Sequence, residues 1–317
     1  PHVGNVLGAI EPAIALTRKE GYEAFLFIAD LHALTQRPDP NELRTQIHSV
    51  AATWLALGLD PERACFYRQS KIPQIAQLAW ILSCSTSMGL LNRAHSFKDA
   101  VAKGKQDDEI NHGLFAYPVL MAADILAFDA NVVPVGRDQK QHLEIAQEAA
   151  RRFNSRYGDA LVIPEARIDD AVMTVPGLDG RKMSKSYDNT LRPFDADKRI
   201  AKQIKSIKTD STEYGAPLPI EDDVILSLHG LLAGEAEHQR LRAQYASGRK
   251  DPAGGDDTNN YFGWGDAKKA LASALSARFG AARETYEAFM ADPDRLEMLL
   301  SSGEARARAH AQVVLDR

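Results

Sequence analysis

The stretch Ala24-Phe25-Leu26-Phe27-Ile28-Ala29, followed by Asp30, decides the fold class of this chain. It is short, apolar and aromatic, as expected of a strand buried on both faces of a parallel sheet. The segment 132–135 (VVPV) repeats that character before Gly136. Because helical patterns alternate with these strands, we predict an α/β fold with a doubly wound parallel sheet. Three of these helical patterns span residues 42–57, 72–88 and 139–153.

Two loops of this predicted sheet are candidate ligand sites on topology alone. Doubly wound sheets bind ligands beyond the carboxyl ends of their strands, which here are the loops 30–35 and 136–139. The Gly4-Asn5 turn opens a further helical pattern that runs to Leu16. The start of such a helix offers free N–H groups to an anion.

Composition limits the classes of function that the chain can serve. Its 317 residues, 44% of them hydrophobic, are enough for two domains with a sizeable core. The formal net charge of -5 argues against a protein that coats nucleic acid, so any RNA contact must use a local basic patch. Cys65 and Cys84 form no CxxC pair, which supports neither a disulfide framework nor a metal site and fits the cytoplasm. No apolar run approaches the ~18 residues needed to span a membrane.

The organisation along the chain changes near residues 187–193. We predict a catalytic sheet domain at 1–190, which lacks an N-terminal strand before Pro1 in this sequence, and a smaller α-helical domain at 191–317. After Pro193 the glycine-punctuated strands disappear, and the polar stretch 247–265 precedes a further helix at 266–279. The last helix is expected to pack back on the catalytic domain.

The segment Lys182-Met183-Ser184-Lys185-Ser186 carries the strongest chemical signal. Two cations and two hydroxyls on a short stretch are suited to clamping a polyphosphate. The alternative is a solvated surface loop. A five-residue match has a chance of about 10⁻⁴ in a chain of this length, which favours the functional interpretation.

This segment resembles the KMSKS signature of class I aminoacyl-tRNA synthetases. The companion HIGH signature resembles His2-Val3-Gly4-Asn5, with Asn at its last position as in many tryptophanyl enzymes. Gly4 would let a nucleotide approach the backbone, and the helix that follows would offer N–H groups to phosphate. The less favoured alternative is that Gly4 is only a simple turn at the start of a helix.

Between the signatures, the segment 117–124 (YPVLMAAD) resembles the amino-acid-binding helix of tryptophanyl-tRNA synthetases. Met121 and Asp124 share one helix face, where they could flank an indole and accept its N–H, and Tyr117 would be a further wall. By spacing alone, Met121 could be a core residue and Asp124 an exposed charge. Tyrosyl enzymes usually have Gln at the position of Met121.

The same resemblance implies the remaining site residues. Segment 136–142 (GRDQKQH) resembles the family's GxDQ segment, His32 with Asp30 lines the tryptophan site, and a lysine at 103 or 105 contacts the triphosphate. The implied catalytic residues are Lys182, Lys185 and Lys105. The implied ATP contacts are His2, Gly4, Asn5, Gly136, Asp138, Val172, Met183, Ser184 and Ser186. The implied tryptophan contacts are Asp124, Met121, Tyr117, His32 and Gln139.

The activity implied is the attack of the tryptophan carboxylate on the α-phosphorus of ATP, with Mg²⁺ as cofactor, followed by transfer of tryptophan to the terminal ribose of tRNA(Trp). The implied partners are tryptophan, this tRNA and a second copy of the chain, without membrane or DNA. Two alternatives stay open: a tyrosyl-tRNA synthetase, and a synthetase-like RNA-binding module without catalysis. The helical domain would bind the anticodon through a basic face that includes Lys198 and Lys202.

Overall fold

The computed structural model describes residues 1–102, 104, 110–136, 140–168, 174–255 and 257–317. The chain divides into two compact units. Unit 1 comprises Pro1–Ala15, Ala52–Gly58 and Met173–Ala291, and unit 2 comprises Leu16–Ala51, Leu59–Val172 and Asp292–Arg317. Each unit is therefore assembled from segments that lie far apart in the sequence.

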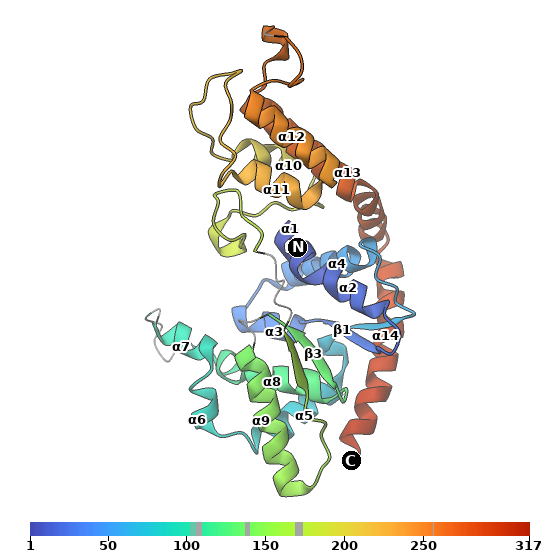
Figure 1. Ribbon diagram of the computed structural model, residues 1–317. Helices are drawn as coiled ribbons and strands as arrows, with labels where there is room; N and C mark the ends of the chain where they lie inside the picture. Colours follow the sequence, from blue (N-terminus) through green and yellow to red (C-terminus); the bar gives the residue numbers. More distant parts are fainter. Residues whose placement is uncertain (103, 105–109, 137–139, 169–173, 256) are drawn as a thin grey trace. The chain divides into compact units, whose positions relative to one another are not determined.

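Helices and short parallel strands make up the described chain (Figure 1). The strands are β1 (Ala24–Ile28), β2 (Ala64–Arg68), β3 (Val132–Val135) and β4 (Glu165–Ile168). The first helices are α1 (Val3–Asn5), α2 (Glu11–Thr17), α3 (Asp30–Ala33), α4 (Pro40–Ala56), α5 (Pro73–Ser83), α6 (Met88–Leu91) and α7 (His95–Ala102). The later helices are α8 (His112–Leu126), α9 (Lys140–Tyr157), α10 (Asp197–Lys205), α11 (Val224–Leu232), α12 (Glu235–Ser247), α13 (Trp264–Ala291) and α14 (Pro293–Leu315). Single turns are η1 (Val6–Ile10), η2 (Leu34–Gln36), η3 (Gln69–Lys71), η5 (Lys185–Tyr187) and η6 (Thr258–Asn260).

Unit 2 contains two pairs of parallel strands. β1 pairs with β2 in a register that sets Ala24 opposite Ala64 and Ile28 opposite Arg68. β3 pairs with β4, with Val132 opposite Glu165. The strands predicted at 24–29 and 132–135 are confirmed as β1 and β3, and their pairing is parallel as predicted, whereas β2 and β4 were not predicted. Parallel pairing carries the ends of β1 and β2 to the same edge, where α3 and η3 begin.

The core of unit 2 joins the strands to α5, α8, α9 and α14. Its buried members include Tyr67 of β2, Leu78 of α5, Ala122 of α8 and Ala307 of α14. At Gly303 the backbone of α14 meets β2 directly, because a Cβ there would lie 1.9 Å from the carbonyl oxygen of Phe66. Only glycine permits this approach, so the last helix packs on the strand that leads into η3.

Unit 1 brings the amino-terminal turns of the chain together with residues 174–291. Val3 donates its N–H to the carbonyl of Leu191 at 2.8 Å, which holds α1 beside the segment that follows η5. Farther along, α11 and α13 pack together through buried leucines such as Leu228 and Leu271. In the described residues, no helix is both long enough and apolar enough to cross a membrane.

Candidate active site

A buried carboxylate on α8 is the centre of the polar cluster in unit 2. Asp124 has a side chain that is only 1% exposed, and it lies 2.8 Å from Nε2 of His32 on α3. The side-chain amide of Gln69, on η3, donates to both carboxylate oxygens of Asp124 at 2.8 and 2.9 Å. Three segments of unit 2 therefore converge on one carboxylate.

The chemistry of the three groups fixes how their protons are arranged. An ionised carboxylate can only accept, so with Asp124 ionised the amide nitrogen of Gln69 faces it and Nε2 of His32 carries the proton. The same orientation lets the amide oxygen of Gln69 accept the backbone N–H of His32 at 3.3 Å. Gln69 thereby links the helix that carries His32 to the helix that carries Asp124.

Asp124 keeps acceptor capacity although two donors already reach it. A carboxylate offers about four lone-pair positions, and these contacts use three of them, which leaves Oδ1 able to accept one more hydrogen bond. Burial raises the pKa of Asp124, and the negative charge of Asp30 adds to that effect, whereas hydrogen bonds from His32 and Gln69 lower it. The two donors therefore act to keep the buried group ionised.

Tyr117 and Met121 lie on the same helix as Asp124. Tyr117 packs edge to face against the ring of His32, with 5.8 Å between ring centroids, and its hydroxyl lies 2.8 Å from Nε2 of His142. Both Tyr117 and Met121 are half-buried. The structure thus brings His32, Tyr117 and Asp124 together, as the sequence predicted, and adds His142 to the group.

The first signature segment lies in unit 1 and forms a closed turn. The backbone N–H of Asn5 donates to Nδ1 of His2 at 3.2 Å, and Oδ1 of Asn5 accepts the N–H of His2 at 3.1 Å. Burial, and after it nearby positive charges that include Lys185, lower the pKa of His2 to about 4. The ring is therefore neutral near pH 7, and since Nδ1 accepts, its proton is on Nε2.

Gly4 brings the two signature segments into contact. A Cβ added at Gly4 would lie 3.1 Å from the ring of His2 and 3.6 Å from Cβ of Met183. Met183 is itself buried, and its N–H donates to the carbonyl of Val175 at 2.9 Å. The residues predicted to face one nucleotide from two sides are thus neighbours in unit 1.

One asparagine organises the second signature segment. Oδ1 of Asn189 accepts the N–H of Ser184 at 2.8 Å, and its amide nitrogen donates to the carbonyl of Lys182 at 3.1 Å and to Asp179 at 2.6 Å. Asn189 is buried, whereas Lys182, Lys185 and Ser186 are exposed. The buried amide therefore holds the backbone while both lysine side chains extend into solvent.

Lys105, Asp138, Gln139 and Val172 lie outside the described residues, and so does Lys103. Gly136 directly follows β3, at the end of the strand where the sheet rule predicts a ligand loop.

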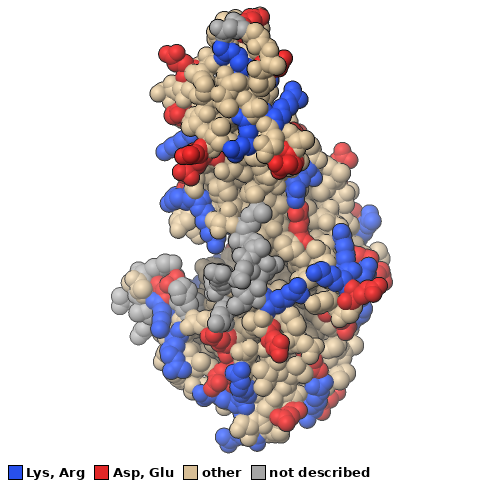
Figure 2. All heavy atoms as spheres, in the orientation of Figure 1, with Lys and Arg blue, Asp and Glu red and all other residues tan. Residues whose placement is uncertain are grey.

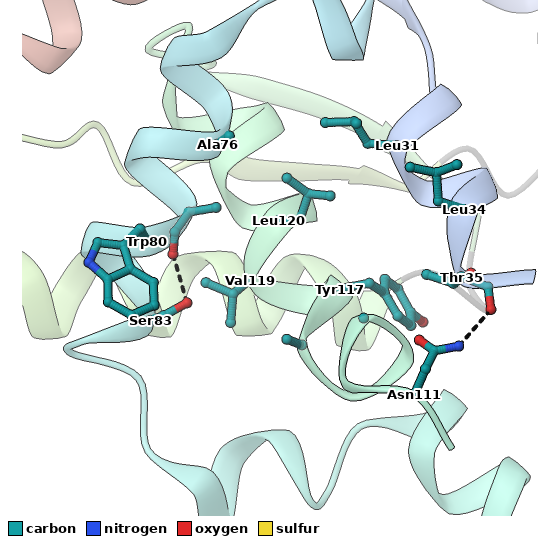
Figure 3. Close-up of a pocket in the computed structure, with 13 residues that line it drawn as sticks. Leu31, Leu34, Thr35, Ala76, Trp80, Ser83, Asn111, Tyr117, Val119 and Leu120 are labelled. Carbon is teal, nitrogen blue, oxygen red and sulfur yellow. Dashed lines mark hydrogen bonds between the residues drawn. The ribbon is translucent and has the colours of Figure 1, made fainter. Parts of the chain in front are cut away.

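A pocket of about 340 Å³ opens elsewhere on unit 2 (Figure 3). Figure 3 shows Leu31 and Leu34 facing Leu120 across it, with Trp80 at one side and Tyr117 at another. Of the predicted tryptophan contacts that the structure describes, only Tyr117 lines this pocket. The pocket is lined largely by apolar residues, and it shares Tyr117 with the polar cluster around Asp124.

Two residues that the sequence did not single out have central places in this geometry. Gln69 directly follows β2, and its position after a buried strand is the only signal that could have pointed to it. Asn189 stands three residues after Ser186, and its contacts to Ser184, Lys182 and Asp179 define the backbone path around the second signature segment.

A model of the family described as tRNA synthetases class I (W and Y) matches residues 1–280. The tryptophan–tRNA ligase of Bordetella parapertussis is 46% identical over 319 residues, which cover 98% of this chain and 68% of that protein. The tryptophan–tRNA ligase of Neisseria meningitidis is 41% identical, and the match covers 100% of this chain and 92% of that protein.

A crystal structure of tryptophanyl-tRNA synthetase from Campylobacter jejuni, complexed with ADP and tryptophan, has a similar fold. It matches with a TM-score of 0.90 and 41% identity, over 100% of this chain and 94% of that one. The likeness therefore extends over both units.

Proposed function

Because the chain belongs to the family of class I tRNA synthetases for tryptophan and tyrosine, we propose that Asp124, Lys182 and Lys185 perform the recognition and the chemistry of its reaction. The reaction is the ATP-dependent activation of tryptophan and its transfer to tRNA. Its first step joins the tryptophan carboxylate to the α-phosphorus of ATP and releases pyrophosphate. The second step moves the tryptophanyl group to the terminal ribose of tRNA(Trp).

The observation that carries the tryptophan assignment is the buried carboxylate of Asp124 with one acceptor position left over. In our proposal Oδ1 of Asp124 accepts the indole N–H, while Met121, Tyr117 and His32 form the walls of the site. Gln139, outside the described residues, orients the polar head of the amino acid. An ionised acceptor at low exposure discriminates strongly, because a substrate without a donor leaves it unpaired.

The nucleotide part of the proposal uses the two signature segments of unit 1. Gly4 offers its backbone to the nucleotide, and Met183 packs beside it. His2, as a neutral ring with its proton on Nε2, and Asn5 serve as hydrogen-bonding groups toward ATP. Ser184 and Ser186 bind phosphate oxygens, while Gly136, Asp138 and Val172 bind the ribose and adenine.

Catalysis in this proposal is positioning and charge stabilisation. Lys182 and Lys185 are exposed cations on a segment whose backbone is held by Asn189, and Lys105 adds a third cation. As pyrophosphate leaves, these cations balance the charge that develops on its oxygens. No covalent intermediate with the protein is needed.

Mg²⁺ enters this proposal as a companion of ATP. Among the described side chains, no group of three or more His, Cys, Asp or Glu residues could hold a metal ion. Mg²⁺ is commonly bound through substrate phosphates with few protein ligands. We therefore assign its ligands to the phosphates.

For the tRNA we propose that the helical part after residue 190 contacts the anticodon. Helix α10 exposes Lys198, Lys202 and Lys205 along one face and buries Ile200 and Ile204 on the other. Arg199 is already paired with Asp195 at 3.0 Å. Figure 2 shows acidic and basic side chains interspersed over the visible face of the helical region, so the RNA contact would be local.

We further propose that the chain forms a homodimer and acts in the cytoplasm. The exposed apolar face of α5 is the candidate interface, because Trp80 is 73% exposed and Ile81 39% exposed beside the pocket of Figure 3. A Trp80→Glu variant should sediment as a monomer at concentrations where the wild type is dimeric. The same sedimentation profile for both proteins would remove this face as the interface.

Both cysteines are free, as suits a reducing compartment.

Pyrophosphate exchange is the decisive test of the activity. The wild type should incorporate labelled pyrophosphate into ATP in the presence of tryptophan, and far more slowly with tyrosine or phenylalanine. Exchange that depends on tyrosine would favour the tyrosyl alternative. Exchange with none of the three would leave the non-catalytic RNA-binding alternative.

A further inference from the structure

The segment between β2 and α5 carries a side chain whose role goes beyond the contacts assigned above. Gln69 is fully buried, and its amide touches Asp124 and the backbone of His32. We infer that Gln69 is a positioning residue, which fixes the carboxylate of Asp124 in place so that it can select tryptophan. This inference rests on the proposed role of Asp124 in the tryptophan site.

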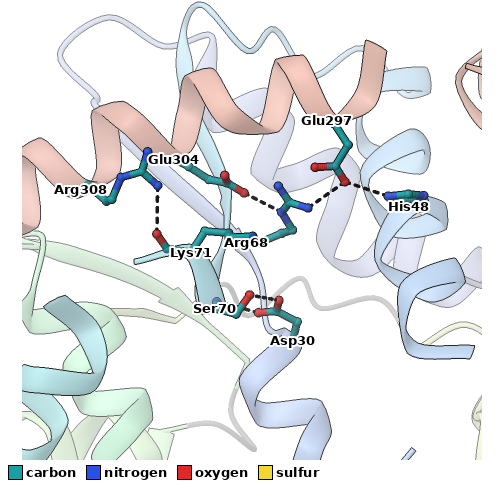
Figure 4. Close-up of polar contacts among 8 residues, drawn as sticks. All are labelled: Asp30, His48, Arg68, Ser70, Lys71, Glu297, Glu304 and Arg308. Carbon is teal, nitrogen blue, oxygen red and sulfur yellow. Dashed lines mark hydrogen bonds and ion pairs between the residues drawn. The ribbon is translucent and has the colours of Figure 1, made fainter. Parts of the chain in front are cut away.

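The residue before Gln69 is held from one side by the last helix. Arg68 is buried, and its guanidinium donates to Glu304 at 2.6 Å and to Glu297 at 2.8 Å, both on α14 (Figure 4). His48 of α4 also reaches Glu297, at 3.0 Å. Charge-assisted contacts from the buried Arg68 to the buried Glu304 and the half-buried Glu297 restrict the backbone at Arg68.

The residues after Gln69 are held as well. The backbone N–H of Ser70 donates to Asp30 at 2.8 Å, and the Ser70 hydroxyl donates to the same carboxylate, as Figure 4 shows. Arg308 of α14 donates to the carbonyl of Lys71 at 3.1 Å. With both flanks anchored, the side chain of Gln69 has little freedom to leave Asp124.

Such fixation affects both the place and the ionisation of the carboxylate. A buried carboxylate that moved by even an ångström would lose its hydrogen bond to a bound indole. Each donor also stabilises the charged form against the cost of burial, which raises the pKa of Asp124. Among the described residues, the other titratable groups that face it are His32 and Asp30 of α3 and Tyr67 of β2.

The main test replaces Gln69 with Met, which has similar length and no hydrogen-bonding amide. The wild type and Gln69→Met are compared by pyrophosphate exchange with tryptophan and with phenylalanine. We expect the ratio of kcat/KM for tryptophan over phenylalanine to fall at least tenfold, the scale of a lost hydrogen bond to a charged group. The matched control Gln74→Met changes an amide that contacts Gln312 instead of Asp124, and its ratio should stay at the wild-type value.

The pH profile separates positioning from simple loss of packing. With one donor gone, the pKa of Asp124 should rise, so the acid limb of kcat/KM for tryptophan should move to higher pH by about one unit for a tenfold effect. A purely structural defect would lower activity without moving this limb. The inference would be overturned by a folded Gln69→Met protein that keeps the wild-type ratio of kcat/KM for tryptophan over phenylalanine and the wild-type pH dependence on the acid side.

A second variant keeps the test informative if Gln69→Met folds poorly. Gln69→Glu keeps the length and the acceptor toward His32, and places a second carboxyl against Asp124. Two such groups share a proton, so this variant should show an alkaline loss of activity, absent from the wild type, as that proton leaves. If the pH profile of activity of Gln69→Glu matched that of the wild type, the result would contradict the inference. Wild-type protein without tryptophan-dependent exchange would instead overturn the proposed function and this inference together.

Discussion

Replacement of Asp124 by Asn is the sharpest perturbation of the proposed tryptophan site. Asn keeps the shape of the side chain and one neutral acceptor, but it loses the charge. The side chain of Asp124 is 1% exposed, so water does not weaken its hydrogen bonds. A hydrogen bond to a charged group contributes about 1.5–3 kcal/mol, which corresponds to a loss in kcat/KM for tryptophan of roughly 10- to 150-fold.

Phenylalanine serves as the internal reference for Asp124→Asn, because it has no N–H to donate. The kcat/KM for phenylalanine should change little. The ratio of kcat/KM for tryptophan over phenylalanine should therefore fall by the same factor as kcat/KM for tryptophan. The assay is pyrophosphate exchange at several concentrations of each amino acid. Asp129→Asn is the control, because Asp129 pairs with Arg317 at the surface and stands at a positive φ that Asn tolerates.

The alanine variant of Asp124 answers a different question. Asp124→Ala leaves Nε2 of the half-buried His32 and the amide of the buried Gln69 without their acceptor, and the buried unpaired donor of Gln69 alone costs about 1–3 kcal/mol of folding stability. Its thermal midpoint should therefore fall together with its activity. A folded Asp124→Asn protein that kept the wild-type ratio would refute the assignment of Asp124 as the indole acceptor.

The remaining predictions concern the phosphate clamp, its support and the RNA contact. Lys185→Ala should slow tryptophan-dependent exchange by roughly a hundredfold or more while tryptophan binding, measured by calorimetry, stays near the wild-type value; near-normal exchange would exclude Lys185 from the clamp. Asn189→Ala removes the contacts to Ser184 and Lys182, so the KM for ATP should rise while the KM for tryptophan stays constant; the opposite pattern would contradict its role. The double variant Lys198→Glu/Lys202→Glu should weaken tRNA binding and reduce its salt dependence, with exchange unaffected. Unchanged tRNA affinity at every salt concentration would exclude this face of α10.

Local sequence patterns predicted those elements whose signal lies within a few residues. The run 24–29 is apolar throughout, and β1 covers all but its last residue. β2 was missed because its five residues stand between Arg63 and Gln69 and end in Arg68, which gives a polar appearance to a fully buried strand. The charge of Arg68 is balanced by Glu297 and Glu304, so the information lies more than two hundred residues away in the sequence.

In the candidate site too, local sequence patterns identified some residues, whereas others depend on contacts with distant parts of the chain. Asp124 could be singled out because it closes an eight-residue motif on one helix, and His32 because it follows a predicted strand. The signal for Gln69 is its position after β2, which was not predicted, and a glutamine between an arginine and a serine resembles an ordinary loop residue. Its importance arises from the parallel pairing of β1 with β2, which carries it to the edge where Asp30 and His32 begin α3.

The contact between Gly303 and β2 also has a consequence for biosynthesis. α14 is made after every other element named here, so while the ribosome synthesises the chain, Arg68 stands in an almost complete unit 2 without Glu297 or Glu304. An unpaired charge at a buried position costs about 3–5 kcal/mol, a large part of the stability of an ordinary domain. Unit 2 of the nascent chain should therefore stay incompletely folded, and accessible to chaperones, until α14 leaves the ribosome. A chain that is cut short before α14 would still carry both signature segments, yet it would lack the carboxylates that anchor the backbone beside Gln69.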